Sequence, residues 1–248
     1  MTATAVAERG FAKLNLILHV GRKRVDGLHP LGSVFASIDL CDELQVEPAD
    51  SDRVDCPGLD GPNLAAAAVV AFRRRVPELP PLNIQIDKRI PVAAGLGGGS
   101  AELGSDVPSQ LDPRHALVSG TGEIVEPVEL PAFGAVLVPQ ETGLSTAAVY
   151  AEFDRLGGGR RDLDLEALRM LTREMALLPV LANDLQPAVL ALRPELARVL
   201  ASLRSAGALG ALVSGSGPTC FGLFEDGAAA ETVAEELDGA VAATLRSV

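Results

Sequence analysis

Four glycines lie within five residues of this chain, at positions 95, 97, 98 and 99. Glycine lets the chain approach a phosphate closely and leaves backbone N–H groups free to face an anion. The surrounding segment, Pro91–Ser100, is not a Walker A loop, because no Gly-Lys-Ser/Thr follows it. The glycines alone fit a flexible surface turn as well as a phosphate cradle. Their place directly after an amphipathic strand favours the cradle.

A second glycine-rich turn, Ser214–Pro218, lies between two short apolar runs. By itself such a turn is more typical of a tight connection between strands than of a ligand loop. Two such turns in one chain support each other as parts of one binding site.

Two charged residues could carry proton chemistry. Asp106 ends a Gly-Ser-Asp turn, and a carboxylate can accept the proton of a nucleophilic hydroxyl. Lys13 is the only formal charge in the apolar run Phe11–Val20, and a lysine beside an aspartate keeps that aspartate ionised. The residues alone also fit an ordinary solvated lysine and an exposed turn, so both interpretations stay open.

Apolar periodicity predicts the elements that must position these residues. It predicts strands before the first glycine loop over Phe11–Val20, Ser33–Asp39, Asp42–Glu47 and Leu82–Ile90, and later over Gly134–Val138, Ala211–Val213, Cys220–Phe224 and Ala240–Arg246. It predicts helices over Leu64–Arg75, Leu165–Leu178, Pro194–Ser205 and Ala228–Leu237, the first of them capped by Asn63. Because strands and helices alternate in both halves, we expect two domains, 1–131 and 132–248.

The composition narrows the class of protein. The chain has 248 residues and a net charge of −12, which does not suit a general nucleic-acid binder. Its three cysteines show no CxxC spacing and predict reduced thiols. No uncharged apolar run reaches the roughly 18–20 residues that cross a bilayer, and Met1–Gly10 does not look like a signal peptide. We expect a cytoplasmic protein that binds neither nucleic acid nor membrane.

The motifs together resemble a known family. Pro91–Ser100 resembles the phosphate loop of the GHMP kinases, Ala12–Leu16 their first motif and Val213–Pro218 their third. Within that superfamily, four segments look like the diphosphocytidyl-methylerythritol kinases: Arg24–His29, Gly104–Pro108, Ser145–Tyr150 and Asn183–Gln186. Mevalonate kinase, homoserine kinase and galactokinase patterns share the glycine loops but not Asp26–His29, which argues against a different GHMP kinase.

The resemblance implies an α+β fold of two α/β domains, with the active site in the cleft between them. The N-terminal domain would be like domain 2 of ribosomal protein S5, and the C-terminal domain would be ferredoxin-like. The implied reaction is ATP-dependent phosphorylation of the 2-hydroxyl of a CDP-linked methylerythritol, a step of the non-mevalonate (MEP) isoprenoid pathway. Mg²⁺ would bridge the phosphates, with Ser100 as a ligand, and the protein would be a monomer or a homodimer.

The resemblance also implies residue roles. Asp106 would be the general base and Lys13 its cationic partner. His29 resembles the residue that reads the cytosine edge and Tyr150 the aromatic that stacks on the base, while Leu28 stands where many relatives have Tyr. The ATP-binding set would be Pro91, Val92, Ala93, Ala94, Gly95, Leu96, Gly97, Gly98, Gly99, Ser100 and Ala101. The substrate-binding set would be Asn15, His29, Tyr150, Ser214, Gly215, Ser216 and Gly217.

One departure from the family pattern bears on activity. In relatives the glycine loop caps a long helix and a second helix leads back to Gly-Ser-Asp-Val-Pro, whereas here only Ser100–Leu103 precedes Gly104. A helical hairpin of about 25–30 residues is therefore missing. Asp106 can still reach the phosphate site, because the residues after Gly99 extend to at most ~23–25 Å.

Two interpretations follow from this departure. A helix N-terminus attracts anions, so its loss would weaken ATP binding and favours an inactive, nucleotide-binding remnant of a kinase. The retention of Lys13, Asp106, His29 and both glycine turns favours an active kinase, since a remnant has no need of the base.

Overall fold

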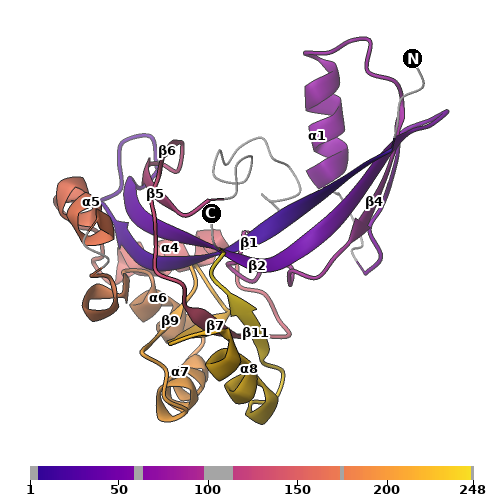
Figure 1. The fold of residues 1–248 in the computed structure, drawn as a ribbon. Helices are drawn as coiled ribbons and strands as arrows, with labels where there is room; N and C mark the ends of the chain where they lie inside the picture. Colours follow the sequence, from indigo (N-terminus) through magenta and orange to yellow (C-terminus); the bar gives the residue numbers. More distant parts are fainter. Residues whose placement is uncertain (1–4, 59–63, 98–113, 174–175, 247–248) are drawn as a thin grey trace.

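A computed structural model of the chain describes residues 5–58, 64–97, 114–173 and 176–246. Its framework is two β-sheets, one of seven strands and one of four (Figure 1). The mixture of two sheets with covering helices confirms the predicted α+β class.

The first sheet is built on two long strands that run through the whole molecule in Figure 1, β1 (Val6–Val20) and β2 (Leu31–Pro48). They pair antiparallel, and the path of the sheet is β3-β4-β2-β1-β8, with β5 and β6 attached beside β2. The shorter members are β3 (Arg53–Asp55), β4 (Leu82–Asp87), β5 (Ala116–Gly120), β6 (Ile124–Pro127) and β8 (Ala182–Asn183).

The prediction of two strands over 33–39 and 42–47 was wrong, because β2 runs through both without a break. Aspartates stand at positions 39 and 42, where the two predicted strands end and begin, and both carboxylates have partners in the folded chain. Asp39 accepts from the backbone N–H and the hydroxyl of Thr244, and the fully buried Asp42 accepts from the N–H groups of Arg89 and Ile90. Long-range hydrogen bonds thus make polar positions compatible with a continuous strand.

The second sheet is antiparallel throughout, in the order β11-β7-β10-β9. Its strands are β7 (Gly134–Val138), β9 (Gly210–Val213), β10 (Cys220–Phe224) and β11 (Val241–Thr244), close to the predicted ranges. Side chains alternate across it. Ala135 and Leu137 join the core shared with the first sheet, while Val136 faces a second core built with the helices.

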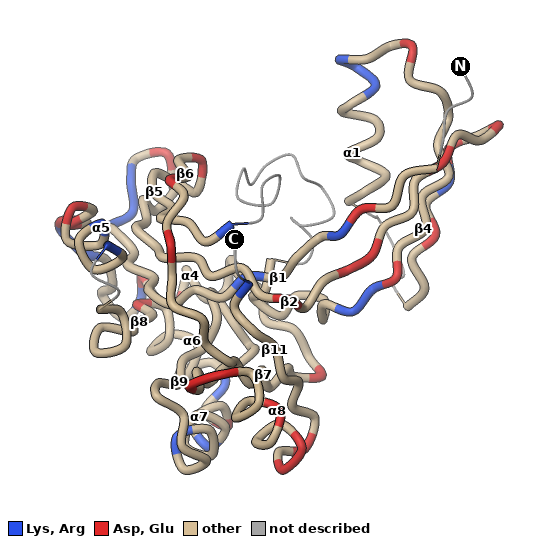
Figure 2. Tube along the Cα trace, viewed as in Figure 1, with Lys and Arg blue, Asp and Glu red and all other residues tan. Residues whose placement is uncertain are grey.

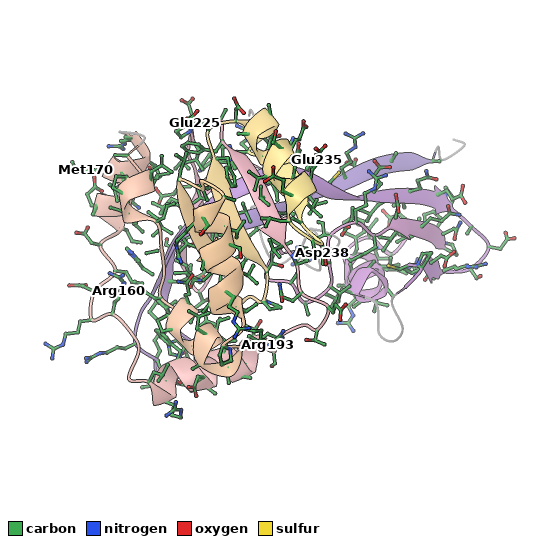
Figure 3. All side chains as sticks on the ribbon, turned by 90° about the horizontal axis from the view of Figure 1, so that it is seen from below. Arg160, Met170, Arg193, Glu225, Glu235 and Asp238 are labelled. Atoms are coloured by element: carbon green, nitrogen blue, oxygen red, sulfur yellow. The ribbon has the colours of Figure 1, made fainter. Side chains whose placement is uncertain are left out.

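Helices cover the outer face of this second sheet. Figure 3 shows α7 (Leu196–Ser205) and α8 (Gly227–Glu236) lying over it, and both pack on its strands. The other helices are α1 (Leu64–Arg73), α4 (Thr146–Arg155), α5 (Leu165–Arg173), α6 (Gln186–Leu192) and the short 3₁₀ helix η1 (Leu178–Val180). No described helix is both long and apolar enough to span a bilayer.

Sequence reasoning did not predict α4 or α6. The segment before Thr146 carries the expected signal for a helix start, since the Ser145 hydroxyl accepts from the N–H of Ala148. Two elements from the later part of the chain also return to the first sheet. β8 pairs parallel with β1, and Leu245 bridges to Ile38. The boundary at residue 131 remains a prediction.

Candidate active site

Lys13 and Asn15 lie on the same face of β1, between two irregularities in its pairing with β2. The register shifts between Phe11 and Lys13 and again between Asn15 and Ile17. Such bulges re-aim side chains and are common beside active sites. Their effect here is to turn two polar side chains of an otherwise buried strand towards the glycine loops.

Lys13 occupies an unusual position for an amine. Its Nζ donates to Oδ1 of Asn15 and to the carbonyl of Gly95, each at 2.5 Å, and it lies 5.4 Å from the centre of the Phe35 ring. Burial lowers the pKa of Lys13 to about 7. Among the described residues no carboxylate lies within ion-pairing distance of this amine. An anion brought beside it would favour its charged form.

The first glycine loop docks directly on this lysine. The backbone N–H of Lys13 donates to the carbonyl of Leu96 at 3.0 Å, and the Gly95 carbonyl accepts from both Lys13 Nζ and the Ser214 hydroxyl. Gly95 has a φ of +76°, and a Cβ there would lie 2.3 Å from the Ser214 carbonyl oxygen. Only glycine therefore allows the two turns to approach this closely.

Ala93 adopts a left-handed φ of +52° in the same loop, a conformation that costs energy for a residue with a Cβ. Gly143 makes room for it, because a Cβ at Gly143 would lie 2.7 Å from that of Ala93. Gly143 was not predicted as part of the site, and nothing in its local sequence indicates this contact.

The second glycine turn, Ser214–Pro218, belongs to the second sheet and also lies against Lys13 and Asn15. Gly215 has a φ of +56°, and a Cβ there would lie 3.3 Å from Lys13 Nζ and 3.1 Å from Asn15 Oδ1. Nδ2 of Asn183 donates to the carbonyls of Val213 and Gly215 at 2.8 and 2.7 Å and so holds the turn in place. The Ser216 hydroxyl lies 2.9 Å from that of Thr146 at the start of α4.

A buried carboxylate that was not predicted as a site residue holds the entrance to the first loop. Asp42 accepts from the N–H groups of Arg89 and Ile90, both at 2.7 Å, and pairs with Lys88 at 2.5 Å. These residues lead directly into Pro91. The signal in the sequence is weak, because an aspartate in a strand usually faces solvent.

His29 and Tyr150 come together at the far end of β1. Their ring centres are 5.1 Å apart, and Phe153 packs edge-on against the His29 ring at 5.9 Å. His29 Nδ1 lies 2.9 Å from the Gly21 carbonyl. Nε2 lies 3.2 Å from a carboxylate oxygen of Asp154 but not in hydrogen-bonding alignment, so it has no hydrogen-bond partner among the described residues. Burial raises the pKa of Tyr150.

The structure therefore brings together Lys13, Asn15, Gly95, Ser214 and Gly215, and separately His29 and Tyr150. Five predicted site residues lie outside the described residues: Gly98, Gly99, Ser100, Ala101 and Asp106. The described residues contain no group of three His, Cys, Asp or Glu that could hold a metal ion.

The acidic residues that the structure describes are not gathered at this site. Figure 2 shows acidic residues on β2 and β4 of the first sheet and on α8 beside the second. An anion at this site would be attracted by Lys13 and by backbone N–H groups, which act locally whatever the net charge of the chain.

Comparison with known proteins agrees with this arrangement. The GHMP kinase N-terminal domain matches residues 63–103 and the GHMP kinase C-terminal domain matches residues 161–243. A 4-diphosphocytidyl-2-C-methyl-D-erythritol kinase of Streptomyces avermitilis is 40% identical over 274 aligned positions, covering 94% of this chain and 92% of that protein. The kinase of the same name from Nocardia farcinica is 41% identical and covers 98% of this chain and 92% of its own. This chain belongs to the 4-diphosphocytidyl-2-C-methyl-D-erythritol kinase family of GHMP kinases.

Solved structures support the membership of this kinase family. A 4-(cytidine 5'-diphospho)-2C-methyl-D-erythritol kinase crystal structure is 33% identical, with a TM-score of 0.84, and the match covers 98% of this chain and 100% of that one. The mevalonate kinase of L. major has a TM-score of 0.69 at 15% identity, which shows a shared fold only. The resemblance drawn from the motifs is thereby confirmed at the level of the family.

The alignments with these kinases also contain positions that this chain lacks. The alignment with the Streptomyces kinase is 274 positions long, but it includes only 94% of the 248 residues of this chain. Some of its positions are therefore gaps in this chain. The relative therefore has residues without a counterpart here, which agrees with a chain shortened relative to its family.

Proposed function

We propose that this chain transfers the γ-phosphoryl group of ATP to the 2-hydroxyl of 4-(cytidine 5'-diphospho)-2-C-methyl-D-erythritol. The observation that carries the proposal is the amine of Lys13, held by Asn15 and Gly95 where two glycine turns meet, with no described carboxylate beside it. A phosphate or an ionised carboxylate at this point would complete its charge balance. The relatives of about 40% identity carry the name of that kinase.

In the proposed reaction, the loop from Pro91 to Ala101 cradles the phosphates of ATP through its backbone N–H groups. Lys13 stabilises negative charge as the phosphoryl group moves, and Asp106 accepts the proton of the attacking hydroxyl. Phosphoryl transfer needs mainly positioning and electrostatic stabilisation, so a preorganised cation suits it.

The cytidine end is assigned to His29 and Tyr150. His29 would bond the base through Nε2, since Nδ1 is held at Gly21. Nε2 lies buried 3.2 Å from a carboxylate oxygen of Asp154, so this contact requires the ring to shift when the substrate binds. Tyr150 offers a ring face beside it. Asn15, Ser214, Gly215, Ser216 and Gly217 would contact the rest of the substrate.

Mg²⁺ is proposed as the metal cofactor, with Ser100 as a protein ligand. Magnesium usually takes few protein ligands and several phosphate or water oxygens, so the lack of a carboxylate cluster among the described residues is compatible with it. When bound, the ion would neutralise charge between the transferred and remaining phosphates.

The finer fold names are proposals as well. The division into 1–131, like domain 2 of ribosomal protein S5, and 132–248, ferredoxin-like, is taken from the family. A cytoplasmic monomer or homodimer is the proposed form of the enzyme.

An inactive, nucleotide-binding homologue is the second candidate, favoured by the residues that this chain lacks relative to its family. The two candidates are separated by measuring ADP release with the CDP-linked substrate. We expect activity that Asp106→Ala abolishes and Lys13→Ala reduces at least about 100-fold. The exposed Asp162 gives a matched control, and Asp162→Ala should leave the rate unchanged.

Titration with a non-hydrolysable ATP analogue extends the test. Micromolar binding would show that another element replaces the helix N-terminus. Normal ATP binding without ADP release on the proposed substrate would refute the active kinase and leave the nucleotide-binding homologue.

A further inference from the structure

Ser33 of β2 lies against the amide of Asn15 and is completely buried. Its hydroxyl donates to the Ile17 carbonyl at 2.6 Å and accepts from Asn15 Nδ2 at 2.9 Å. A carbonyl oxygen can only accept, so the single hydroxyl hydrogen is committed to Ile17. Ser33 can therefore only accept from Asn15, and the NH₂ end of that amide must face it.

The oxygen end of the Asn15 amide then has to face Lys13. Oδ1 accepts from the amine at 2.5 Å. An amide turned the other way would set its NH₂ group against the amine and remove one of the two acceptors of Lys13. Asn15 is only 3% exposed, so water cannot readily replace the lost acceptor.

The backbone carbonyl of Ile17 begins the series of hydrogen bonds that runs through Ser33 and Asn15 to Lys13. The register between β1 and β2 shifts between Asn15 and Ile17, so two residues of β1 advance against one of β2. A bulge interrupts the ladder and frees a carbonyl for a side chain. The backbone irregularity thus decides which way the Asn15 amide points.

We propose that Ser33 is a positioning residue of this active site, which orients the Asn15 amide so that its oxygen holds the Lys13 amine. Its effect on catalysis rests on the proposed function, but the orientation can be measured without activity. The chain has only three lysines, Lys13, Lys23 and Lys88, so the Lys13 side-chain NMR signal can be assigned by substitution.

The test compares Ser33→Ala with Ser37→Ala. Ser37 is buried in the same strand, pairs with Lys13 in the β1–β2 register, and its hydroxyl has no hydrogen-bond partner among the described residues. Ser33→Ala should move the titration midpoint of Lys13 to lower pH, by about tenfold in its protonation equilibrium, because the charged form loses a hydrogen-bond acceptor. Ser37→Ala should leave the midpoint in place.

In the active enzyme, kcat should fall about tenfold in Ser33→Ala and the alkaline limb of its pH profile should move to lower pH, with KM for ATP little changed. The Asn15→Asp variant provides a second test, because both terminal atoms of its side chain are oxygens and either can face the Lys13 amine. In that variant, Ser33→Ala should shift the titration midpoint of Lys13 little further. An unchanged Lys13 midpoint in folded Ser33→Ala, or equal effects of both serine variants, would overturn the proposal. If the unmodified chain is inactive, the proposed function fails and the midpoint still decides the role of Ser33.

Discussion

At the scale of single residues, Lys13 places an amine where burial opposes its charge. Its pKa falls from the ordinary 10.5 to about 7, and Asn15 Oδ1 and the Gly95 carbonyl accept two of the three hydrogens of its charged form. A pKa shifted to near neutral is typical of residues in functional sites. Such residues often make the folded protein less stable than an apolar residue at the same position would. The site should therefore be less stable with lysine than with an apolar side chain of similar length.

We expect Lys13→Met to reduce activity at least about 100-fold and to raise the free energy of unfolding by a few kcal/mol near pH 6. In the wild type, the unfolded lysine binds a proton more readily than the folded one between pH 7 and 10.5. The contribution of Lys13 to the free energy of unfolding therefore rises as the pH increases from 7 to 10.5. The advantage of the methionine variant should shrink as pH increases.

Urea denaturation at pH 6, 8 and 10 measures this trend. A difference between the two proteins that stays constant over those pH values would contradict a depressed pKa of Lys13.

At the scale of elements, the two glycine turns are joined by contacts that no larger residue permits. Gly95 combines a left-handed φ with a close approach to the Ser214 carbonyl, so its substitution acts through two effects. Gly239 allows the effect of φ to be measured without the effect of the close approach. It has a similar φ of +68°, but nothing lies near the position that a Cβ would take.

We expect Gly95→Ala to weaken binding of an ATP analogue at least tenfold and to lower the melting temperature, because the loop must move away from Lys13 and Ser214. Gly239→Ala should cost only the backbone strain, about 1–2 kcal/mol, with analogue binding unchanged. Calorimetric titration and thermal melts measure both. Equal loss of binding in the two variants would show that φ alone decides the loop.

At the scale of the whole molecule, a few long-range contacts join the two sheets around the site. β8 is only two residues long, yet Asn183 ties it to the last residue of β9 and to the following turn through two hydrogen bonds. The N–H of Leu185 donates to Asn183 Oδ1 at 2.9 Å. Asp39 and Thr244 form a second link between β2 and β11. These links set how the Lys13 side of the site meets the Gly215 side.

We expect Asn183→Ala to lower the free energy of unfolding by about 2–4 kcal/mol, since three buried hydrogen bonds lose a partner. Asn83→Ala removes an amide that bonds only at the surface, to Glu47, and should change stability by less than about 0.5 kcal/mol. Urea denaturation compares them. If both cost the same, Asn183 would not be a junction between the sheets.

Much of this arrangement follows from the local sequence. The strand before the first glycine loop, the antiparallel pair around the second turn and the helices near 64, 165, 196 and 227 were all predicted from periodicity. The motifs also predicted the family correctly. These features are encoded within short windows, where side-chain period and turn residues carry the information.

Only the tertiary structure decided what depends on residues far apart in the chain. Asp42 closes on Arg89 and Ile90, Ser33 orients Asn15, and Gly143 makes room for Ala93. Strand register and bulges bring these groups together, and neither is determined by a local pattern. The sequence by itself therefore determined the chemistry available to this protein, a lysine and two glycine turns. Folding decided the buried environment that lowers the lysine pKa and orients its partners, because both effects come from long-range packing.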